Sequence, residues 1–232
     1  MSWIAFGAAV APALFLVWYF ASKDVFPEPL HMLVKAFFWG IVIIIPVLMI
    51  GAPVQALLEG ITNPYVMGVA SAFLTAAIPE EAMKLYAVHR IARSKHFDEP
   101  MDGIVYAATA SLGFACFENV LYVMDGGIAT AVMRAVTAVP AHALFGVVMG
   151  WYVAQARFGK GSARGAYFRA FLIPMIFHGI YDTPLLALAA HSSPPGWLVA
   201  VAWLVVIGVI WWLARFARVA VRDLRANQLR DA

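Results

Sequence analysis

Charged side chains are scarce in this sequence, and their scarcity indicates the class of the protein. Asp, Glu, Lys and Arg make up 12% of the chain, whereas a soluble domain carries about 25%. Hydrophobic residues make up 63%, and the mean hydropathy is +0.82. These values predict an integral membrane protein, and the short connections between the apolar runs leave no room for a sizeable soluble domain.

Cysteine is nearly absent as well. The single cysteine, Cys116, excludes an internal disulfide bond, and we expect it to behave as a small buried apolar side chain. A catalytic thiol is not favoured, because on a helix Cys116 would point about 200° away from Glu118. The basic residues fall in loops and in the C-terminal tail, so the sequence pI of about 9.1 indicates no nucleic-acid partner.

Seven apolar runs are long enough to cross a bilayer, which takes about 20 helical residues. The predicted spans are residues 2–21, 31–51, 64–90, 101–124, 128–156, 167–191 and 197–216. The first run lacks a basic segment before it and a clear cleavage site, so we interpret it as a retained span rather than a signal peptide. Together the spans predict an all-α polytopic protein forming one domain over residues 1–232.

Among the connections between spans, Lys and Arg occur in the first, third and fifth and in the C-terminal tail, and none occurs in the N-terminus or in the second, fourth and sixth connections. Because positive residues stay on the cytoplasmic side, this alternation predicts that the N-terminus lies outside and the C-terminus lies in the cytoplasm.

Ionisable side chains inside the predicted spans are few, and they come from four consecutive helices. Each costs about 2.5–3.5 kcal/mol to insert at the centre of a bilayer, so such residues face the interior of a bundle and usually mark a functional path. The polar residues of these spans are Glu80, Glu81, Lys84, Glu118, Asn119, Arg134, His142, His178 and Asp182. The sequence therefore predicts a buried polar site.

The spacing within the spans adds detail to this site. Glu80 and Lys84 are four residues apart and are expected to pair on one helix face, whereas Glu81 lies about 100° around the helix and is free for another partner. His178 and Asp182 have the same spacing, so the carboxylate is expected to orient the imidazole.

Helical rise places Glu80, His142 and His178 near one depth, with Glu118 and Arg134 closer to the outer face. Uncertainty of about 6 Å in the span boundaries leaves open whether these residues form one layer or two.

Two routes to the same chemistry remain open. Two histidines and a carboxylate are a known catalytic ligand set for zinc, here His142, His178 and Glu118, with a second carboxylate as the general base. Alternatively no metal binds, and a buried glutamate takes a proton from water while a histidine and Asn119 stabilise the oxyanion. Both routes end in attack of water on a carbonyl group within the membrane.

The polar motifs resemble those of the PrsW family of intramembrane proteases, which are distantly similar to the CAAX prenyl proteases and bacteriocin-processing enzymes. The matching segments are KDVFPEP (23–29), PEEAMK (79–84), GFACFENVLY (113–122), HALFGVVMG (142–150) and HGIYD (178–182). The resemblance covers nearly the whole chain, in order, and implies a multi-pass protein of a bacterial cell membrane.

By this resemblance, Glu80 and Glu81 supply the base that activates water, and Lys84 holds one of them. Glu118 and Asn119 match a Phe-x-x-x-Glu-Asn motif, in which Glu118 stands where the wider relatives have a histidine. His178 and Asp182 match the family's His-x-x-x-Asp motif, and His142 matches a further histidine of the family. The resemblance implies site-one cleavage of a membrane-anchored anti-sigma factor, which releases a stress-response sigma factor, and it implies either a metalloprotease or a glutamic-type protease.

Two other classes of function are compatible with buried Glu and His residues. A proton-coupled transporter or channel would use them as a relay, although the inverted repeats typical of many transporters are not evident. A non-catalytic membrane scaffold would tolerate their replacement by apolar residues.

Overall fold

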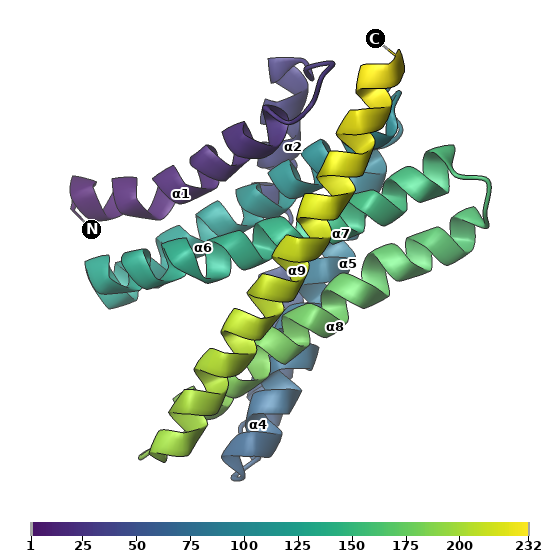
Figure 1. Cartoon of the computed structure of the whole chain (residues 1–232). Helices are drawn as coiled ribbons and strands as arrows, with labels where there is room; N and C mark the ends of the chain where they lie inside the picture. Colours follow the sequence, from purple (N-terminus) through teal and green to yellow (C-terminus); the bar gives the residue numbers. More distant parts are fainter. Residues whose placement is uncertain (1, 232) are drawn as a thin grey trace.

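The computed structural model describes residues 2–231, and every regular element in that range is a helix. The elements are α1 Trp3–Ala21, α2 Leu30–Val42, α3 Ile44–Leu58, α4 Pro64–Ala70, the π-helix η1 Ser71–Ala77, α5 Ile78–Ile91, α6 Pro100–Val136, α7 Ala138–Phe158, α8 Ala163–Ala190 and α9 Gly196–Asp231 (Figure 1). The predicted all-α class is confirmed.

Short polar residues begin several of these helices. The side chains of Ser2, Asn63 and Ser162 each accept a hydrogen bond from a backbone N–H of the first turn of α1, α4 and α8, respectively. These caps satisfy donors that have no partner inside the helix. The helix starts are therefore encoded locally in the sequence.

Six helical stretches of the described residues are long and apolar enough to cross a membrane. They are Trp3–Ala21, Leu30–Leu58, Pro64–Ile91, Pro100–Phe158, Ala163–Ala190 and Gly196–Arg230. The predicted multi-pass membrane protein is therefore confirmed. Its exact number of crossings and its orientation stay predictions.

The stretch Pro100–Phe158 is a hairpin rather than one straight rod. As a straight helix its 59 residues would measure about 90 Å, about three times the hydrocarbon thickness of a bilayer. Gly127 interrupts α6 with φ 67° and ψ −160°, a conformation available only to glycine. Beyond it the chain folds back, so that His142 Nε2 lies 3.0 Å from Glu118 Oε2. The hairpin thus brings two predicted spans together.

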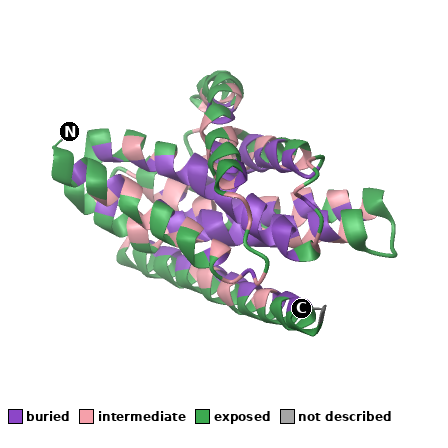
Figure 2. Cartoon of the chain, turned by 90° about the horizontal axis from the view of Figure 1, so that it is seen from above, coloured by how far each residue is buried: buried purple, intermediate pink, exposed green. Residues whose placement is uncertain are grey.

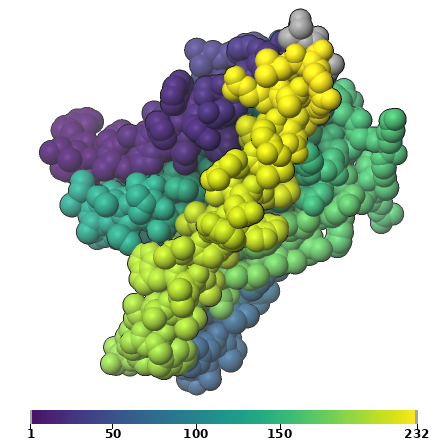
Figure 3. Space-filling view, viewed as in Figure 1, coloured from purple at the N-terminus to yellow at the C-terminus, as the bar shows by residue number. Residues whose placement is uncertain are grey.

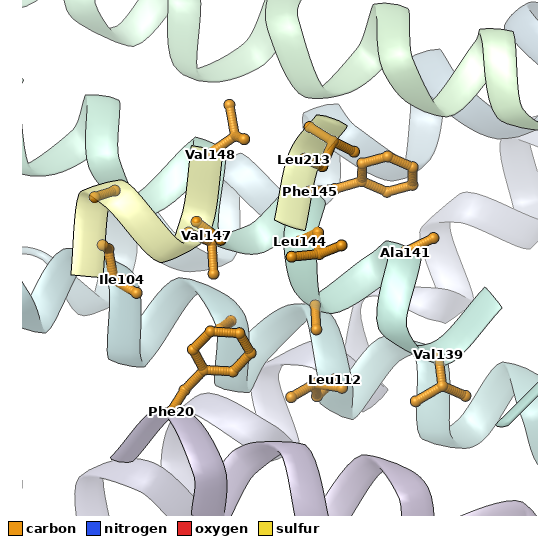
Figure 4. Close-up of a cluster of buried hydrophobic side chains, with 14 of the residues drawn as sticks. Phe20, Ile104, Leu112, Val139, Ala141, Leu144, Phe145, Val147, Val148 and Leu213 are labelled. Atoms are coloured by element: carbon orange, nitrogen blue, oxygen red, sulfur yellow. The ribbon is translucent and has the colours of Figure 1, made fainter. Parts of the chain in front are cut away.

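The core lies between the first arm of α6 and α7. Small residues permit this close packing: a Cβ atom on Gly146 would lie only 2.7 Å from the carbonyl oxygen of Ala107, and one on Gly150 would collide with the carbonyl of Gly103. Small residues spaced in this way allow helix backbones to approach each other in membranes. Figure 4 shows the apolar side chains of α6 and α7 meeting Phe20 of α1 and Leu213 of α9.

The outer helices keep apolar side chains on the surface. Buried residues gather in the central helices, whereas the peripheral helices are largely exposed (Figure 2). On α9, which crosses one face of the molecule diagonally (Figure 3), Leu204, Ile207 and Trp211 are exposed and lie on one helix face. An exposed apolar face of this kind is what a lipid-facing helix requires.

A π-helix precedes the acidic pair that the sequence singled out. The N–H of Ile78 donates to the carbonyl of Phe73, five residues earlier, at the end of η1. In an α-helix the ring of Pro79 would collide with the carbonyl of Thr75, so the wider turn accommodates the proline. Glu80 and Glu81 therefore follow directly after the π-helix, inside the continuous helical stretch Pro64–Ile91.

Candidate active site

Lys84 of α5 is the centre of the buried polar site. Its Nζ atom lies 2.7 Å from Glu81 Oε1, 3.2 Å from Glu80 Oε2 and 2.9 Å from His142 Nδ1. Lys84 and Glu81 are completely buried, and the ammonium also lies 4.5 Å from the ring centre of Phe114. A lysine held by three polar partners and an aromatic face is fixed in position.

His178 of α8 joins the acidic pair to a third carboxylate. Its Nδ1 atom lies 2.9 Å from Glu81 Oε1, and its Nε2 atom lies 3.1 Å from Asp182 Oδ2. The Nε2 atom also lies 3.9 Å from Glu80 Oε2. The ring of Phe145 stacks on the imidazole with 5.0 Å between the ring centres. Both ring nitrogens thus face carboxylates, and Phe145 and the carboxylates together fix the orientation of the ring.

The hydrogen bonds of His142 indicate its tautomer. Nδ1 lies beside the ammonium of Lys84, which has only protons to donate, so Nδ1 acts as the acceptor. Nε2 then carries the proton and donates to Glu118 Oε2 at 3.0 Å. His142 therefore connects the α5 acidic pair to α6 as a neutral imidazole.

The turn at Gly127 supplies the remaining partners. Arg134 lies beyond the turn, and its Nη2 atom donates to Glu118 Oε2 at 2.8 Å while its Nε donates to Asn119 Oδ1 at 2.9 Å. The Nδ2 atom of Asn119 donates in turn to the carbonyl of Ala9 in α1. Both ends of the Asn119 amide are occupied, so it ties α1 and the hairpin together rather than facing the acidic pair.

The structure joins all eight of the predicted site residues in one continuous network. The two depth layers left open by the sequence are one layer, because His142 contacts both Lys84 and Glu118. One detail differs from expectation: Glu81 is not free of Lys84, and of the two glutamates it lies closer to the ammonium. This occurs because the long lysine side chain reaches residues three and four positions before it equally well.

Arg134 was predicted to be a polar residue within the spans but not a site residue, and the structure adds it to the site through Glu118 and Asn119. Its only signal in the sequence is that it and Glu118, of opposite charge, lie on either side of Gly126-Gly127. Phe114 and Phe145 carried no sequence signal, because aromatic residues are common throughout the apolar spans.

Three side chains could hold a metal ion in this site. Glu80, His142 and His178 each offer a ligand atom, and these atoms lie within 4.8 Å of one another. This group differs from the predicted ligand set in its third member, since Glu118 faces His142 and Arg134 instead. Two imidazoles and a carboxylate suit zinc, although each imidazole nitrogen already has a polar partner that a metal would replace.

One carboxylate oxygen of the site is buried without a partner. Glu81 Oε2 makes no hydrogen bond, while Oε1 of the same group contacts both Lys84 and His178. Buried polar atoms are nearly always satisfied, so an orphan oxygen at the centre of a polar network marks a place for a water molecule or a reacting group.

Comparisons with known proteins agree with the motifs. Residues 28–213 match the family described as PrsW family intramembrane metalloprotease. The chain is 42% identical to the protease PrsW of Geobacillus kaustophilus, covering 78% of this chain and 79% of the relative. It is 38% identical to that of Bacillus subtilis over 78% of this chain and 83% of the relative. The protease PrsW of Halalkalibacterium halodurans is 31% identical over 89% of this chain and 92% of its own length. No solved structure matches the chain.

Proposed function

Because this chain belongs to the PrsW family of intramembrane proteases, we propose that it hydrolyses its substrate with a water molecule activated at Glu81. The protein is a multi-pass intramembrane endopeptidase. The family assignment favours this activity over the transporter and the scaffold.

The orphan oxygen of Glu81 carries the proposal. A general base must lie within hydrogen-bond reach of the proton that it removes, and its other contacts must hold it still. Lys84 and His178 hold Oε1 of Glu81, while Oε2 has no partner and is enclosed by protein. Glu81 is therefore the better candidate for the base, and Glu80 is the neighbour that shares Lys84.

The other members of the network have positioning roles in this proposal. His178 lies between Glu81 and Asp182 and holds Oε1 of Glu81, which leaves Oε2 to take the proton from water. Lys84 holds the acidic pair and fixes His142 as a neutral ring. Glu118, Asn119 and Arg134 hold His142 and the hairpin in place. Asn119 is not free to stabilise an oxyanion directly, because both ends of its amide are occupied.

The metal route remains part of the proposal, since the family is described as one of metalloproteases. Glu80, His142 and His178 would hold the ion, and Glu81 would keep its role as the base. When bound, zinc would lower the pKa of a coordinated water to about 7. A glutamic-type route uses the same base and leaves Glu80 with Lys84.

We propose a membrane-anchored protein as the substrate, because the site is enclosed by helices that the bilayer surrounds. The resemblance of the motifs further suggests an anti-sigma factor. Its cleavage in the membrane would be the first step in releasing a stress-response sigma factor.

Matched glutamine variants test the base. Glu81→Gln keeps the volume and the acceptor facing Lys84 but cannot take a proton, so we expect it to abolish cleavage of a membrane-anchored reporter while the protein still inserts and purifies. Exposed Glu59, in the connection between α3 and α4, provides the control Glu59→Gln, which should retain full activity. Full activity of Glu81→Gln would refute the assignment of the base.

Chelation separates the two routes. If the site works as a metalloprotease, the purified protein should lose activity with a chelator and regain it with zinc, and Glu80→Gln should lose metal content. If it works as a glutamic-type protease, chelation should change nothing while Glu81→Gln remains inactive.

A further inference from the structure

A second group of carboxylates gathers at the opposite end of α6 from the hairpin turn. Asp24 and Glu28 come from the connection between α1 and α2, and Asp102 comes from the first turn of α6. Each offers an oxygen atom, and the three oxygens lie within 4.8 Å of one another. We propose that this cluster binds a hard divalent cation, Mg²⁺ or Ca²⁺, separately from the proteolytic site.

Two oxygens of this cluster are buried and unsatisfied. Asp102 is completely buried and Asp24 is 6% exposed, yet Asp102 Oδ1 and Asp24 Oδ2 have no hydrogen-bond partner. Their companion oxygens do have partners: Asp102 Oδ2 accepts from the N–H groups of Asp98 and Glu99. Asp24 Oδ1 accepts from Phe26 N–H and from Gln228. The protein thus fixes both carboxylates while leaving one oxygen of each free for a ligand.

No basic side chain neutralises the cluster among the residues that the structure describes. The ion pairs there involve Lys84, Arg134, Arg222 and the two site histidines only. The C-terminal helix α9 carries several arginines, but it contacts the cluster through the neutral amide of Gln228, which donates to Asp24 and to the adjacent Glu99. A bound cation would supply the missing positive charge.

The ligand atoms identify the class of cation. They are all carboxylate oxygens, which Mg²⁺ and Ca²⁺ prefer, and no imidazole or thiol belongs to the group. Glu28 is only partly buried and receives a hydrogen bond from Tyr106, so it stands at the rim.

The consequence of binding would be mechanical. A cation held by Asp24, Glu28 and Asp102 would fasten the α1–α2 connection to the start of α6, the helix that carries Glu118. Gln228 would extend this fastening to α9, because it bonds both Asp24 and Glu99. The ion would therefore stabilise the fold without touching the reacting atoms.

Calorimetric titration of the full chain in lipid nanodiscs tests the proposal. After removal of metals, MgCl₂ and CaCl₂ are titrated separately, and Tm is followed with each salt. We expect one binding event per chain and a rise in Tm. Glu28→Gln keeps an acceptor for Tyr106 and should weaken binding at least about tenfold, the scale of loss seen when the groups around a metal are altered. Asp24→Asn should do the same, whereas the exposed control Glu59→Gln should bind normally.

A variant of the proteolytic site tests whether the cation binds there instead of at the carboxylate cluster. In His142→Ala/His178→Ala, cation binding and the rise in Tm should persist, because that site contributes nothing to the cluster. The proposal is overturned if neither cation binds, if the double histidine variant abolishes binding, or if Glu28→Gln binds as well as the parent. A parent protein that binds no cation, together with a higher Tm of Glu28→Gln in metal-free buffer, also overturns it. That result would mean that two carboxyl groups of the cluster share a proton in place of a cation.

Discussion

The contact between Gly179 and Phe73 gives the sharpest test of how the site is assembled. Gly179 follows His178 on α8, and Phe73 belongs to the π-helix η1 that precedes the acidic pair. A Cβ atom on Gly179 would lie 2.7 Å from Phe73 Cδ1 and nearer still to two other ring carbons. We expect Gly179→Ala to push α8 away from η1 and to lengthen the bond between His178 and Glu81.

The size of the effect follows from the distances. Carbon atoms normally meet at about 3.5–4.0 Å, so the added methyl group demands a shift of about 1 Å or more. Overpacking of this kind costs about 1–3 kcal/mol of stability. A 1 Å misplacement of a catalytic group costs about 100-fold in rate. The bond at stake is 2.9 Å long, so such a shift would break it.

The assay is cleavage of a membrane-anchored reporter, measured together with Tm in nanodiscs. Gly208→Ala on α9 is the control, because a Cβ atom there meets nothing within 4 Å. Phe73→Leu should remove the obstruction, so Gly179→Ala/Phe73→Leu should recover much of the lost activity. Undiminished activity of Gly179→Ala would refute this reasoning. Failure of the double variant to recover, with Phe73→Leu itself active, would refute it equally.

Two further substitutions test the polar network. Lys84→Met leaves two buried carboxylates without their cation, so it should lower the free energy of unfolding by about 3–5 kcal/mol and lower Tm. Adding Glu81→Gln should restore part of that stability. An unchanged Tm in Lys84→Met would contradict this account. Arg134→Met should lower activity about 10- to 100-fold, because it releases Glu118 from its place beside His142. Arg134→Lys keeps the positive charge and should retain more activity than Arg134→Met. If Arg134→Met cleaves the reporter at the parental rate, the arginine has no positioning role.

Hydropathy and charge were sufficient to predict the helical class and the membrane environment. Apolar runs of about 20 residues can satisfy their backbone only as helices in lipid, so their composition determines their secondary structure. The inward direction of Glu80, Glu81, Lys84, His142 and His178 followed from the cost of exposing charge to hydrocarbon. That the chain forms one domain stays a prediction.

The tertiary structure decided which polar groups meet. Spacing along one helix could pair Glu80 with Lys84, but it could not show that Lys84 also reaches His142 from another helix. The helical rise per residue could not show whether Glu118 and His142 lie at the same depth in the membrane. An error of a few residues at a span boundary shifts the estimated depth by several ångströms. The π-helix and the turn at Gly127 set those positions, and neither follows from hydrophobicity.

The sequence by itself determined that this protein crosses the membrane as helices and keeps its few charges away from lipid, because apolar side chains gain free energy in hydrocarbon and charged side chains lose it. Only the tertiary structure decided that Glu81 has one oxygen held and one left free. That distinction depends on contacts with Lys84 and His178, and His178 comes from a segment about 100 residues away in the chain.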